Sequence, residues 1–132
     1  YTKTYTDNMA FTKTQFFVDS NGNKRVQPVT CDVVTSAAVN LRLAKDISMQ
    51  QVEEVMRVRM HKIIQLFIKN KTDILILGAF GCGVFMNDPR VIAKIWKDEL
   101  SKYGGYFDRV VFSIMGSTET VNYKEFAGAF TM

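Results

Sequence analysis

The 132-residue sequence has few of the residues that build metal sites and disulfide frameworks. Its two cysteines, Cys31 and Cys82, lie far apart and have no further Cys or His at ligand spacing, so the sequence predicts neither a zinc site nor a disulfide framework. The single histidine, His61, falls beside the apolar stripe of a predicted helix and has no evident partner, which favours a surface or boundary position over catalysis. We therefore expect no metal and no cofactor, and the free thiols suit a reducing cytoplasm.

Long apolar runs and clusters of basic residues are also missing. The longest apolar stretch, residues 74–86, is too short to span a bilayer and is interrupted by three glycines, and the first residues do not form a signal-peptide pattern. The formal net charge of +4 suits an anionic ligand, but a mildly basic surface is the more ordinary interpretation. We expect a cytoplasmic protein with no membrane association and no direct nucleic-acid binding.

What the sequence does contain is one alternation of strand-like and helix-like segments, in a chain long enough for one domain. Residues 1–28 are predicted to be extended segments around a turn at 19–23, where Asn21-Gly22 supplies the positive φ angles of a hairpin. Residues 29–132 are predicted to alternate between strands and helices. The expected strands are 30–35, 73–77 and 109–114, and the expected helices are 48–69, 88–103 and 122–130. This order is typical of a largely parallel sheet covered on both faces.

The clearest predicted element is the helix at 48–69, where apolar residues recur at spacings of three and four and form one stripe toward a core. The stripe consists of Val52, Val55, Met56, Met60, Ile63, Ile64 and Phe67. Ser48 and Gln51 have the spacing of a capping box at its start. Asn70 is expected to end the helix in a left-handed conformation.

The glycine-rich loop, residues 78–85, is the main candidate for chemistry. It follows the continuous apolar run 73–77, which is typical of a strand buried on both faces. It precedes a helix expected to begin with Asp88 as N-cap and Pro89 at the first position and to end at Gly104 or Gly105. Ligands of such sheets bind beyond the carboxyl ends of the strands, where loop amides can hold phosphate oxygens. The glycine spacing matches neither the dinucleotide fingerprint nor a Walker loop, so by pattern alone a structural turn is an equal alternative.

Several segments together carry a resemblance to a known family. They are Leu77-Gly-Ala-Phe-Gly-Cys-Gly-Val-Phe85 with Asn87 and Pro89 after it, the strand within 107–114, and the upstream stretches 5–9 and 32–40. Over nearly the whole chain these segments resemble the microbial-type poly(ADP-ribose) glycohydrolase family. Val39 stands where proline is usual in that family, which is a mild departure.

The resemblance implies a macrodomain-like, three-layer α/β/α fold with a largely parallel mixed sheet that is incomplete in this chain. Residues 1–132 would be the C-terminal part of a single ADP-ribose-binding domain. Loop amides from Gly81 to Val84 would wrap the diphosphate, and Phe85 would pack against the distal ribose. The implied ligand-binding residues are Gly78, Gly81, Cys82, Gly83, Val84, Phe85, Ala37, Ala38 and Asn40.

Each of these roles has a plainer alternative. Phe85 is also explained as a core residue, Asn40 as a turn residue, and Cys82 as a small buried thiol. The adenine side of the cleft is expected near the end of the last strand. Candidates there are Ser117, Asn122, Tyr123 and Phe126, of which the two aromatic residues are equally well explained by packing.

Family enzymes have a triple-glycine loop followed by a Gln-Glu-Glu triplet, whose second Glu protonates the leaving ribose oxygen. This chain has no such segment. General acid catalysis needs a carboxyl group beside the anomeric centre, and the acidic pair Glu53-Glu54 is predicted to lie on the solvated face of a helix. We therefore assign no catalytic residue within the chain.

The resemblance thus implies the ADP-ribose-binding portion of a protein whose parent activity hydrolyses ribosyl O-glycosidic bonds of (poly-)ADP-ribose, and it leaves open whether this chain is an enzyme. The first alternative is a non-catalytic ADP-ribose or nucleotide-binding module, and the second is an interaction module in which the loop is only a turn. The expected partners are ADP-ribose or an ADP-ribosylated protein, together with an upstream fragment or a second copy that completes the sheet.

Overall fold

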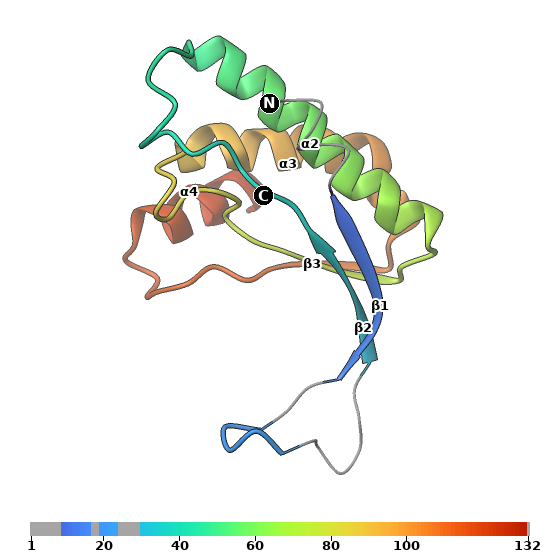
Figure 1. The fold of residues 1–132 in the computed structure, drawn as a ribbon. Helices are drawn as coiled ribbons and strands as arrows, with labels where there is room; N and C mark the ends of the chain where they lie inside the picture. Colours follow the sequence, from blue (N-terminus) through green and yellow to red (C-terminus); the bar gives the residue numbers. More distant parts are fainter. Residues whose placement is uncertain (1–8, 17–18, 24–29, 132) are drawn as a thin grey trace. The chain divides into compact units, whose positions relative to one another are not determined.

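A computed structural model describes residues 9–16, 19–23 and 30–131, and Figure 1 shows the elements along the chain. The chain divides into two compact units, residues 1–36 and 37–132. Among the described residues, no helix is both long and apolar enough to cross a membrane.

The first unit contains an antiparallel pair of strands. Strand β1 (Ala10–Phe16) pairs with β2 (Thr30–Thr35), and the register shifts between Thr12 and Gln15. The predicted strand at 30–35 is confirmed, but within the described residues it pairs with its hairpin partner rather than with the parallel sheet. Local pairing across a turn favours this antiparallel arrangement.

The predicted turn at 19–23 is confirmed. The Asp19 carboxylate accepts the backbone N–H groups of Asn21 and Asn23 at 2.9 and 3.0 Å, and Gly22 has a φ of +81°. These hydrogen bonds, that from Asn23 first, hold the pKa of Asp19 below its ordinary value. The predicted extended residues 24–26 and the motif residues 5–8 lie outside the described residues.

The second unit begins with its longest helix, α2 (Met49–Lys69). The capping box is confirmed, because the Ser48 hydroxyl accepts the Gln51 N–H at 3.1 Å and the Gln51 side chain accepts the Ser48 N–H at 2.9 Å. The left-handed end predicted at Asn70 is wrong by one residue. Asn70 has a φ of −93° and its side chain donates to the carbonyl one turn back at 2.8 Å, whereas Lys71 takes the left-handed φ of +56°.

The apolar stripe of α2 faces the core as predicted. Its buried members are Val52, Met56, Met60, Ile63, Ile64 and Phe67. His61 takes the predicted boundary position, and it has a partner from the neighbouring helix, since its Nδ1 lies 2.9 Å from the Glu99 carboxylate.

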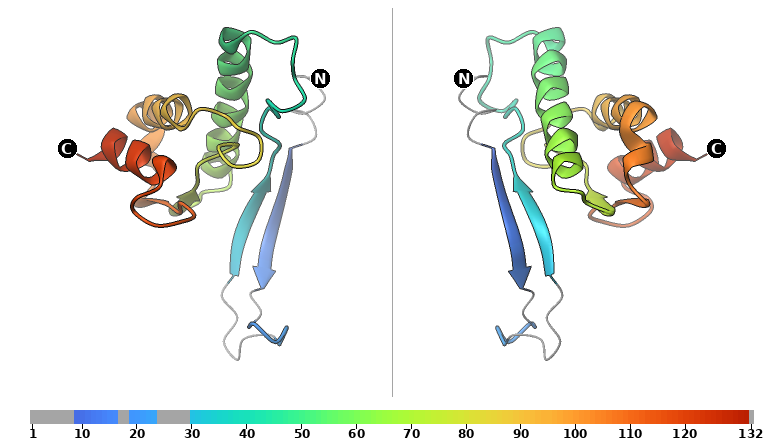
Figure 2. Two further views of the ribbon diagram at one scale, coloured as in Figure 1. Left: turned by 90° about the vertical axis from the view of Figure 1, so that its left-hand side faces the viewer. Right: turned by 90° about the vertical axis from the view of Figure 1, so that its right-hand side faces the viewer.

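The remaining helices are α3 (Pro89–Tyr103), the short 3-10 turn η1 (Gly104–Tyr106) and α4 (Val121–Phe130). The predicted start of α3 is confirmed, because Asp88 caps it by accepting the Arg90 N–H at 2.9 Å, with Pro89 at the first position. Gly104 is its C-cap, as predicted. Helix α3 packs between α2 and α4, as the side views in Figure 2 show.

The parallel sheet of this unit consists, among the described residues, of β3 (Ile74–Leu77) and β4 (Arg109–Phe112). On its inner face, Leu75 and Leu77 of β3 are buried, and Val110 and Phe112 of β4 are half-buried. Phe112 packs against Phe126 and Phe130 of α4. The mixed α/β fold class is therefore confirmed, with a small parallel sheet.

The prediction that β3 is buried on both faces is wrong for the described chain. Leu75 and Leu77 are buried, but Ile74 and Ile76 on the other face are 57% and 67% exposed. A continuous apolar run shows that both faces of a strand are suited to burial. It does not show that the same chain provides the segments that bury them.

Candidate functional site

The first half of the glycine-rich loop is held by hydrogen bonds to its own backbone and to α3. The Gly78 carbonyl accepts the indole N–H of the buried Trp96 at 3.1 Å and the Phe80 N–H at 2.9 Å. The Ala79 carbonyl accepts the Cys82 N–H at 3.0 Å. A Cβ at Gly78 would lie 3.3 Å from the Ser113 carbonyl oxygen, so the end of β3 passes close to the chain that follows β4.

Asn87 is the main anchor of the loop, and the sequence analysis named it as part of the motif without assigning it a role. It is only 4% exposed, and its Nδ2 donates to the carbonyls of Val39 at 2.8 Å and Gly81 at 3.0 Å. Its backbone N–H also donates to the Gly81 carbonyl, at 3.0 Å. Asn87 therefore ties the loop to the segment that follows β2.

Gly81 is required where these two segments meet. Its φ is +76°, and a Cβ at this position would lie 2.5 Å from the Ala38 Cβ and 2.7 Å from the Asn87 amide nitrogen. Side chains rarely adopt this φ, and both neighbours are buried. The two stretches that the sequence analysis placed in one cleft are thus in direct contact at Gly81 and Ala38.

The second half of the loop is open. A Cβ at Gly83 would have no atom within 4 Å, and Val84 is 70% exposed. Within the described part of the chain, the backbone N–H groups of Gly83, Val84 and Phe85 donate to no protein group. Phe85 is half-buried, and its carbonyl accepts the Leu41 N–H at 3.0 Å. Consecutive free amides next to a helix start are suited to an anion.

Two other predicted site residues make backbone contacts. The Ala37 carbonyl accepts a hydrogen bond from the buried Arg59 guanidinium at 2.8 Å. The Asn40 side chain accepts the Arg42 N–H at 3.1 Å, and the Asn40 carbonyl accepts two further backbone N–H groups. Asn40 therefore shapes the turn after Ala37, which is the plainer of its two predicted roles.

Of the four candidates for the adenine side, Asn122 reaches the loop, since its amide lies 3.5 Å from the Cys82 carbonyl. Phe126 is buried against Phe112 and is a core residue. Tyr123 is exposed, and Ser117 forms part of the turn before α4.

Cys82 lies in the loop as a partly buried thiol. Burial, with a smaller effect of the negative charge of Asp88, raises the pKa of Cys82 to about 12. The thiol is protonated at neutral pH, which disfavours a nucleophilic role.

Neither Asp88, which follows the loop, nor the acidic pair Glu53-Glu54 suits a general acid. Asp88 pairs with Arg90 at 2.8 Å, and the hydrogen bond from Arg90 lowers the pKa of Asp88, so this carboxyl is ionised at neutral pH and does not suit a general acid. Glu53 pairs with Arg57 at 2.8 Å, and Glu54 is exposed. No group of three or more described His, Cys, Asp and Glu residues is arranged to hold a metal ion.

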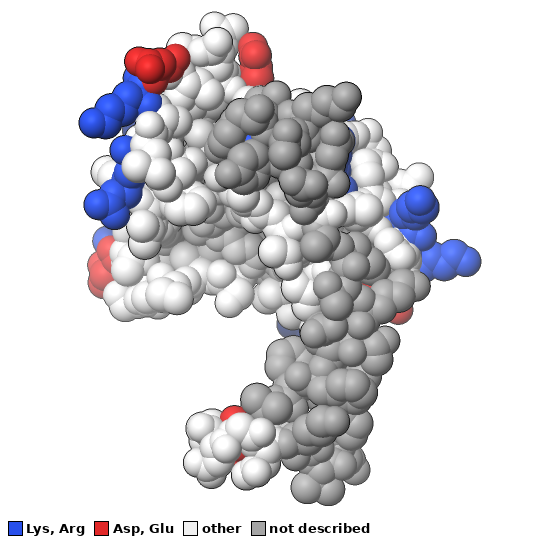
Figure 3. All heavy atoms as spheres, viewed as in Figure 1, with Lys and Arg blue, Asp and Glu red and all other residues white. Residues whose placement is uncertain are grey.

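Charge on the surface is mixed in sign. On the face drawn in Figure 3, the described lysine and arginine side chains lie in separate groups at the edges, with acidic side chains beside some of them. On this face, the described basic side chains therefore form no broad patch that would suit an anion.

Comparison with known proteins gives a clear result for structure only. The sequence matches no protein-family model and no curated protein. The structure is similar to the poly(ADP-ribose) glycohydrolase of Thermomonospora curvata, with a TM-score of 0.81 and 28% identity over 91% of this chain and 46% of that one. It is also similar to the enzyme of Deinococcus radiodurans solved in complex with ADP-ribose, with a TM-score of 0.80 and 25% identity over 90% of this chain and 50% of that one.

The predicted resemblance is therefore confirmed at the level of the fold. This chain has the macrodomain-like fold of the microbial poly(ADP-ribose) glycohydrolases. It spans about half the length of the structures that it matches.

Proposed function

We propose that this chain is the ADP-ribose-binding part of a poly(ADP-ribose) glycohydrolase-like protein. The observation that carries the proposal is the run of free backbone N–H groups from Gly83 to Phe85, presented by an anchored loop in this fold. A similar structure, that from Deinococcus radiodurans, was solved with ADP-ribose bound. A diphosphate has several anionic oxygens, and neutral amide donors can hold them without a basic side chain.

In this proposal, the loop from Gly81 to Val84 surrounds the diphosphate with its backbone. The N–H groups of Gly81, Gly83 and Val84 are free to donate to it, whereas the Cys82 N–H already donates to the Ala79 carbonyl. Gly78 sets the turn at the end of β3, since its carbonyl is held by Trp96. Phe85 packs against the distal ribose. Ala37, Ala38 and Asn40 form the adjoining wall of the cleft, which is supported by the contact of Ala38 with the loop at Gly81.

We further propose that residues 1–132 belong to one macrodomain-like domain, as its C-terminal part. The support is that a single structural match covers 91% of the chain. In such a domain a further polypeptide would cover the apolar sheet face at Ile74 and Ile76, because parallel sheets are normally covered on both faces. An upstream segment fits this role, given that the matched structures are about twice as long as the aligned part. A second copy of the chain is the other outcome, and the mass of the complex in solution distinguishes the two.

The activity that we propose for the parent protein is hydrolysis of the ribosyl O-glycosidic bonds of ADP-ribose chains. This reaction needs a carboxylic acid that protonates the leaving ribose oxygen. Asp88 does not suit this role because it is ionised and caps α3. The acid would therefore be supplied by the second Glu of a Gln-Glu-Glu triplet on an upstream polypeptide.

Calorimetry and a turnover assay test this division. The chain should bind ADP-ribose, and it should release no ADP-ribose from a modified protein when it is alone. Addition of an upstream polypeptide with the triple-glycine and Gln-Glu-Glu segments should restore release, and a change of the second Glu of the triplet to Gln should lower it by about 100-fold to 10,000-fold.

The assay also discriminates the alternatives. Turnover by the chain alone would contradict the division between binding and chemistry. Binding without turnover in every mixture would favour a non-catalytic ADP-ribose-binding module. No binding of ADP-ribose in any mixture would leave the loop as a structural turn.

A further inference from the structure

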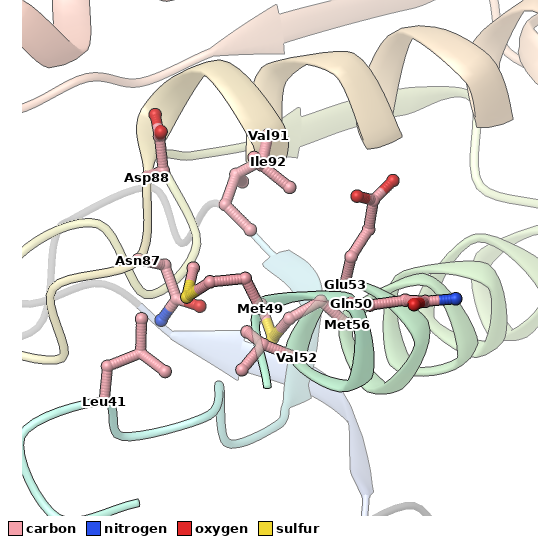
Figure 4. Close-up of a pocket in the computed structure, with 10 residues that line it drawn as sticks. All are labelled: Leu41, Met49, Gln50, Val52, Glu53, Met56, Asn87, Asp88, Val91 and Ile92. Carbon is pink, nitrogen blue, oxygen red and sulfur yellow. The ribbon is translucent and has the colours of Figure 1, made fainter. Parts of the chain in front are cut away.

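Asn87 joins two segments that lie far apart in the sequence. Its Nδ2 lies 2.8 Å from the Val39 carbonyl, in the segment after β2, and 3.0 Å from the Gly81 carbonyl, in the glycine-rich loop. Both distances are those of well-formed hydrogen bonds. In Figure 4, which shows a cavity beside this side chain, the Asn87 nitrogen lies on the side of Leu41, in the segment after β2. One amide group therefore fixes the separation between the loop and that segment.

The segment after β2 is also held by α2, but those contacts do not include the loop. The Arg59 guanidinium donates to the Ala37 carbonyl at 2.8 Å, and the Val39 N–H donates to the Met56 sulfur at 3.4 Å. These contacts fix the segment to the helix. Asn87 differs from them because the same nitrogen also holds the loop, at the glycine whose φ of +76° leaves no room for a side chain.

Few side chains could replace this amide. Asparagine has two donor protons on one nitrogen, whereas a hydroxyl group has one and an ionised carboxylate has none. Asn87 is only 4% exposed, so water cannot easily take the place of its donors. Its Oδ1 is buried and accepts no hydrogen bond from the described residues, which costs free energy. A residue present at such a cost is typical of a functional site.

We propose that Asn87 is a positioning residue for ADP-ribose, an inference that rests on the proposed function of the chain. Its two hydrogen bonds turn the Gly81 carbonyl oxygen away from the diphosphate and hold the free N–H groups of 83–85 in a fixed place beside Ala38 and Asn40. Donors that are already in place bind a ligand more tightly, because less free energy is lost in ordering them. Without Asn87, only a fraction of the molecules would have this arrangement, and the apparent affinity would fall by that fraction.

Asn87→Asp tests the proposal because it removes the donors and keeps the shape of the side chain. At about pH 8 the carboxylate donates to neither carbonyl, so the affinity for ADP-ribose, measured by calorimetry, should be about tenfold weaker than that of the unaltered chain. Burial favours the protonated form of this carboxyl. At about pH 5 it should therefore carry a proton and donate to one of the two carbonyls, and the affinity should recover in part.

The other groups near Asn87 do not supply this pH dependence. Burial raises the pKa of Cys82 to about 12, so the thiol stays protonated, and the hydrogen bond from Arg90 lowers the pKa of Asp88, so this carboxyl stays ionised. Glu53 lines the same cavity as Asn87 and forms an ion pair within α2. Arginine remains charged over this range. All of these groups are present in the unaltered chain, whose pH profile is subtracted from that of the variant.

Asn70→Asp is the matched control. The Asn70 amide also donates to a carbonyl, that of Leu66, at 2.8 Å, but it lies at the end of α2 and before β3, whereas the loop follows β3. This change should lower the stability, because it removes a hydrogen bond and places a negative charge at the C-terminus of a helix. It should leave the affinity for ADP-ribose unchanged at both pH values. If Asn87 were only a structural residue, its variant would behave in the same way.

A second variant covers the case in which Asn87→Asp does not fold at about pH 8. Asn87→Ala lacks the donors and brings no charge into the interior, so it should bind ADP-ribose about tenfold more weakly at both pH values. At about pH 5, Asn87→Asp should then bind more tightly than Asn87→Ala. Equal affinities of these two variants would overturn the proposal.

Two other results would also overturn it. They are an affinity of Asn87→Asp that equals that of the unaltered chain at about pH 8, and a loss of affinity that is the same at both pH values. Either result, with ADP-ribose bound by the unaltered chain, would leave the proposed function intact. No binding by the unaltered chain would contradict the proposed function, and this inference with it.

Discussion

The two halves of the glycine-rich loop are built in opposite ways. In the first half, carbonyl groups of Gly78 and Gly81 are held by Trp96 and Asn87, and no side chain fits at Gly81. In the second half, Gly83 has open space around it and the backbone N–H groups donate to no described residue. One half fixes the position of the loop, and the other presents free donors.

This difference shows that glycine occurs at two positions of one motif for two separate physical reasons. Gly81 is glycine because of its left-handed φ and its contacts with Ala38 and Asn87. Gly83 has neither constraint, so its lack of a side chain matters only if something approaches the backbone from outside. Variants at these two positions separate the stability of the loop from its binding.

The largest effect is expected for Gly81→Ala. The added methyl group would adopt an unfavourable φ and overlap with Ala38 and Asn87, so the free energy of unfolding should fall by about 2–5 kcal/mol. Denaturation with urea measures this loss. Gly83→Ala is the matched control and should change the stability by less than about 0.5 kcal/mol. Equal losses for the two variants would show that the two halves of the loop do not differ.

The next effect concerns binding. Gly83→Glu should weaken ADP-ribose binding by about 100-fold, because the side chain blocks the free amides and its charge repels the diphosphate. The stability should change little, since a side chain at Gly83 meets no other atom. Gly83→Gln has nearly the same size without the charge and should have a smaller effect, which separates blocking from repulsion. Calorimetry that gives unchanged affinity for the Glu variant would contradict the loop assignment.

The sequence predicts the local elements of this fold well, because their signals are local. The capping box of Ser48 and Gln51 and the N-cap Asp88 depend on residues within one turn, and all of them form as expected. The resemblance in the glycine-rich loop also identified the fold. The left-handed residue after α2 shows the limit of such signals, since Asn70 is held right-handed by its own hydrogen bond to the preceding turn.

Features that depend on distant segments could not be predicted in the same way. Asn87 precedes a helix in the sequence, where asparagine is typical of an ordinary turn, and only the fold places it against the Val39 carbonyl. The exposed face of β3 has a similar cause. Ile74 and Ile76 are as hydrophobic as buried residues, but they are exposed because no described segment packs on their face of the strand. The sequence of the strand alone does not show whether such a segment exists.

A smaller effect is expected at the end of the open half, for Phe85→Ala. Loss of the ring's contact with the ribose should weaken ADP-ribose binding by about twofold to tenfold. Removal of a core phenylalanine side chain costs about 3–5 kcal/mol of stability. Because Phe85 is only half-buried, Phe85→Ala should cost less than that. The matched control is Phe67→Ala in the buried stripe of α2, for which stability should fall by that larger amount. Should Phe85→Ala lose as much stability as the control without loss of affinity, Phe85 would belong to the core and not to the site.

The effect that is smallest at neutral pH is expected from the thiol between the two halves, because it appears only at alkaline pH. Burial raises the pKa of Cys82 from 9.0 to about 12, so between these pH values the unfolded chain releases the thiol proton while the folded chain keeps it. The folded state then binds more protons than the unfolded state, and the stability must fall as the pH rises above about 9. Serine does not titrate in this range, so the Cys82→Ser variant should lose less stability than the unaltered chain between pH 8 and about 10.5. Lysine and tyrosine titrate in both proteins and cancel in the difference. Urea denaturation at several pH values gives the free energy of unfolding against pH for both proteins. Parallel curves would contradict the prediction, because they would mean that folding does not shield the Cys82 thiol from water.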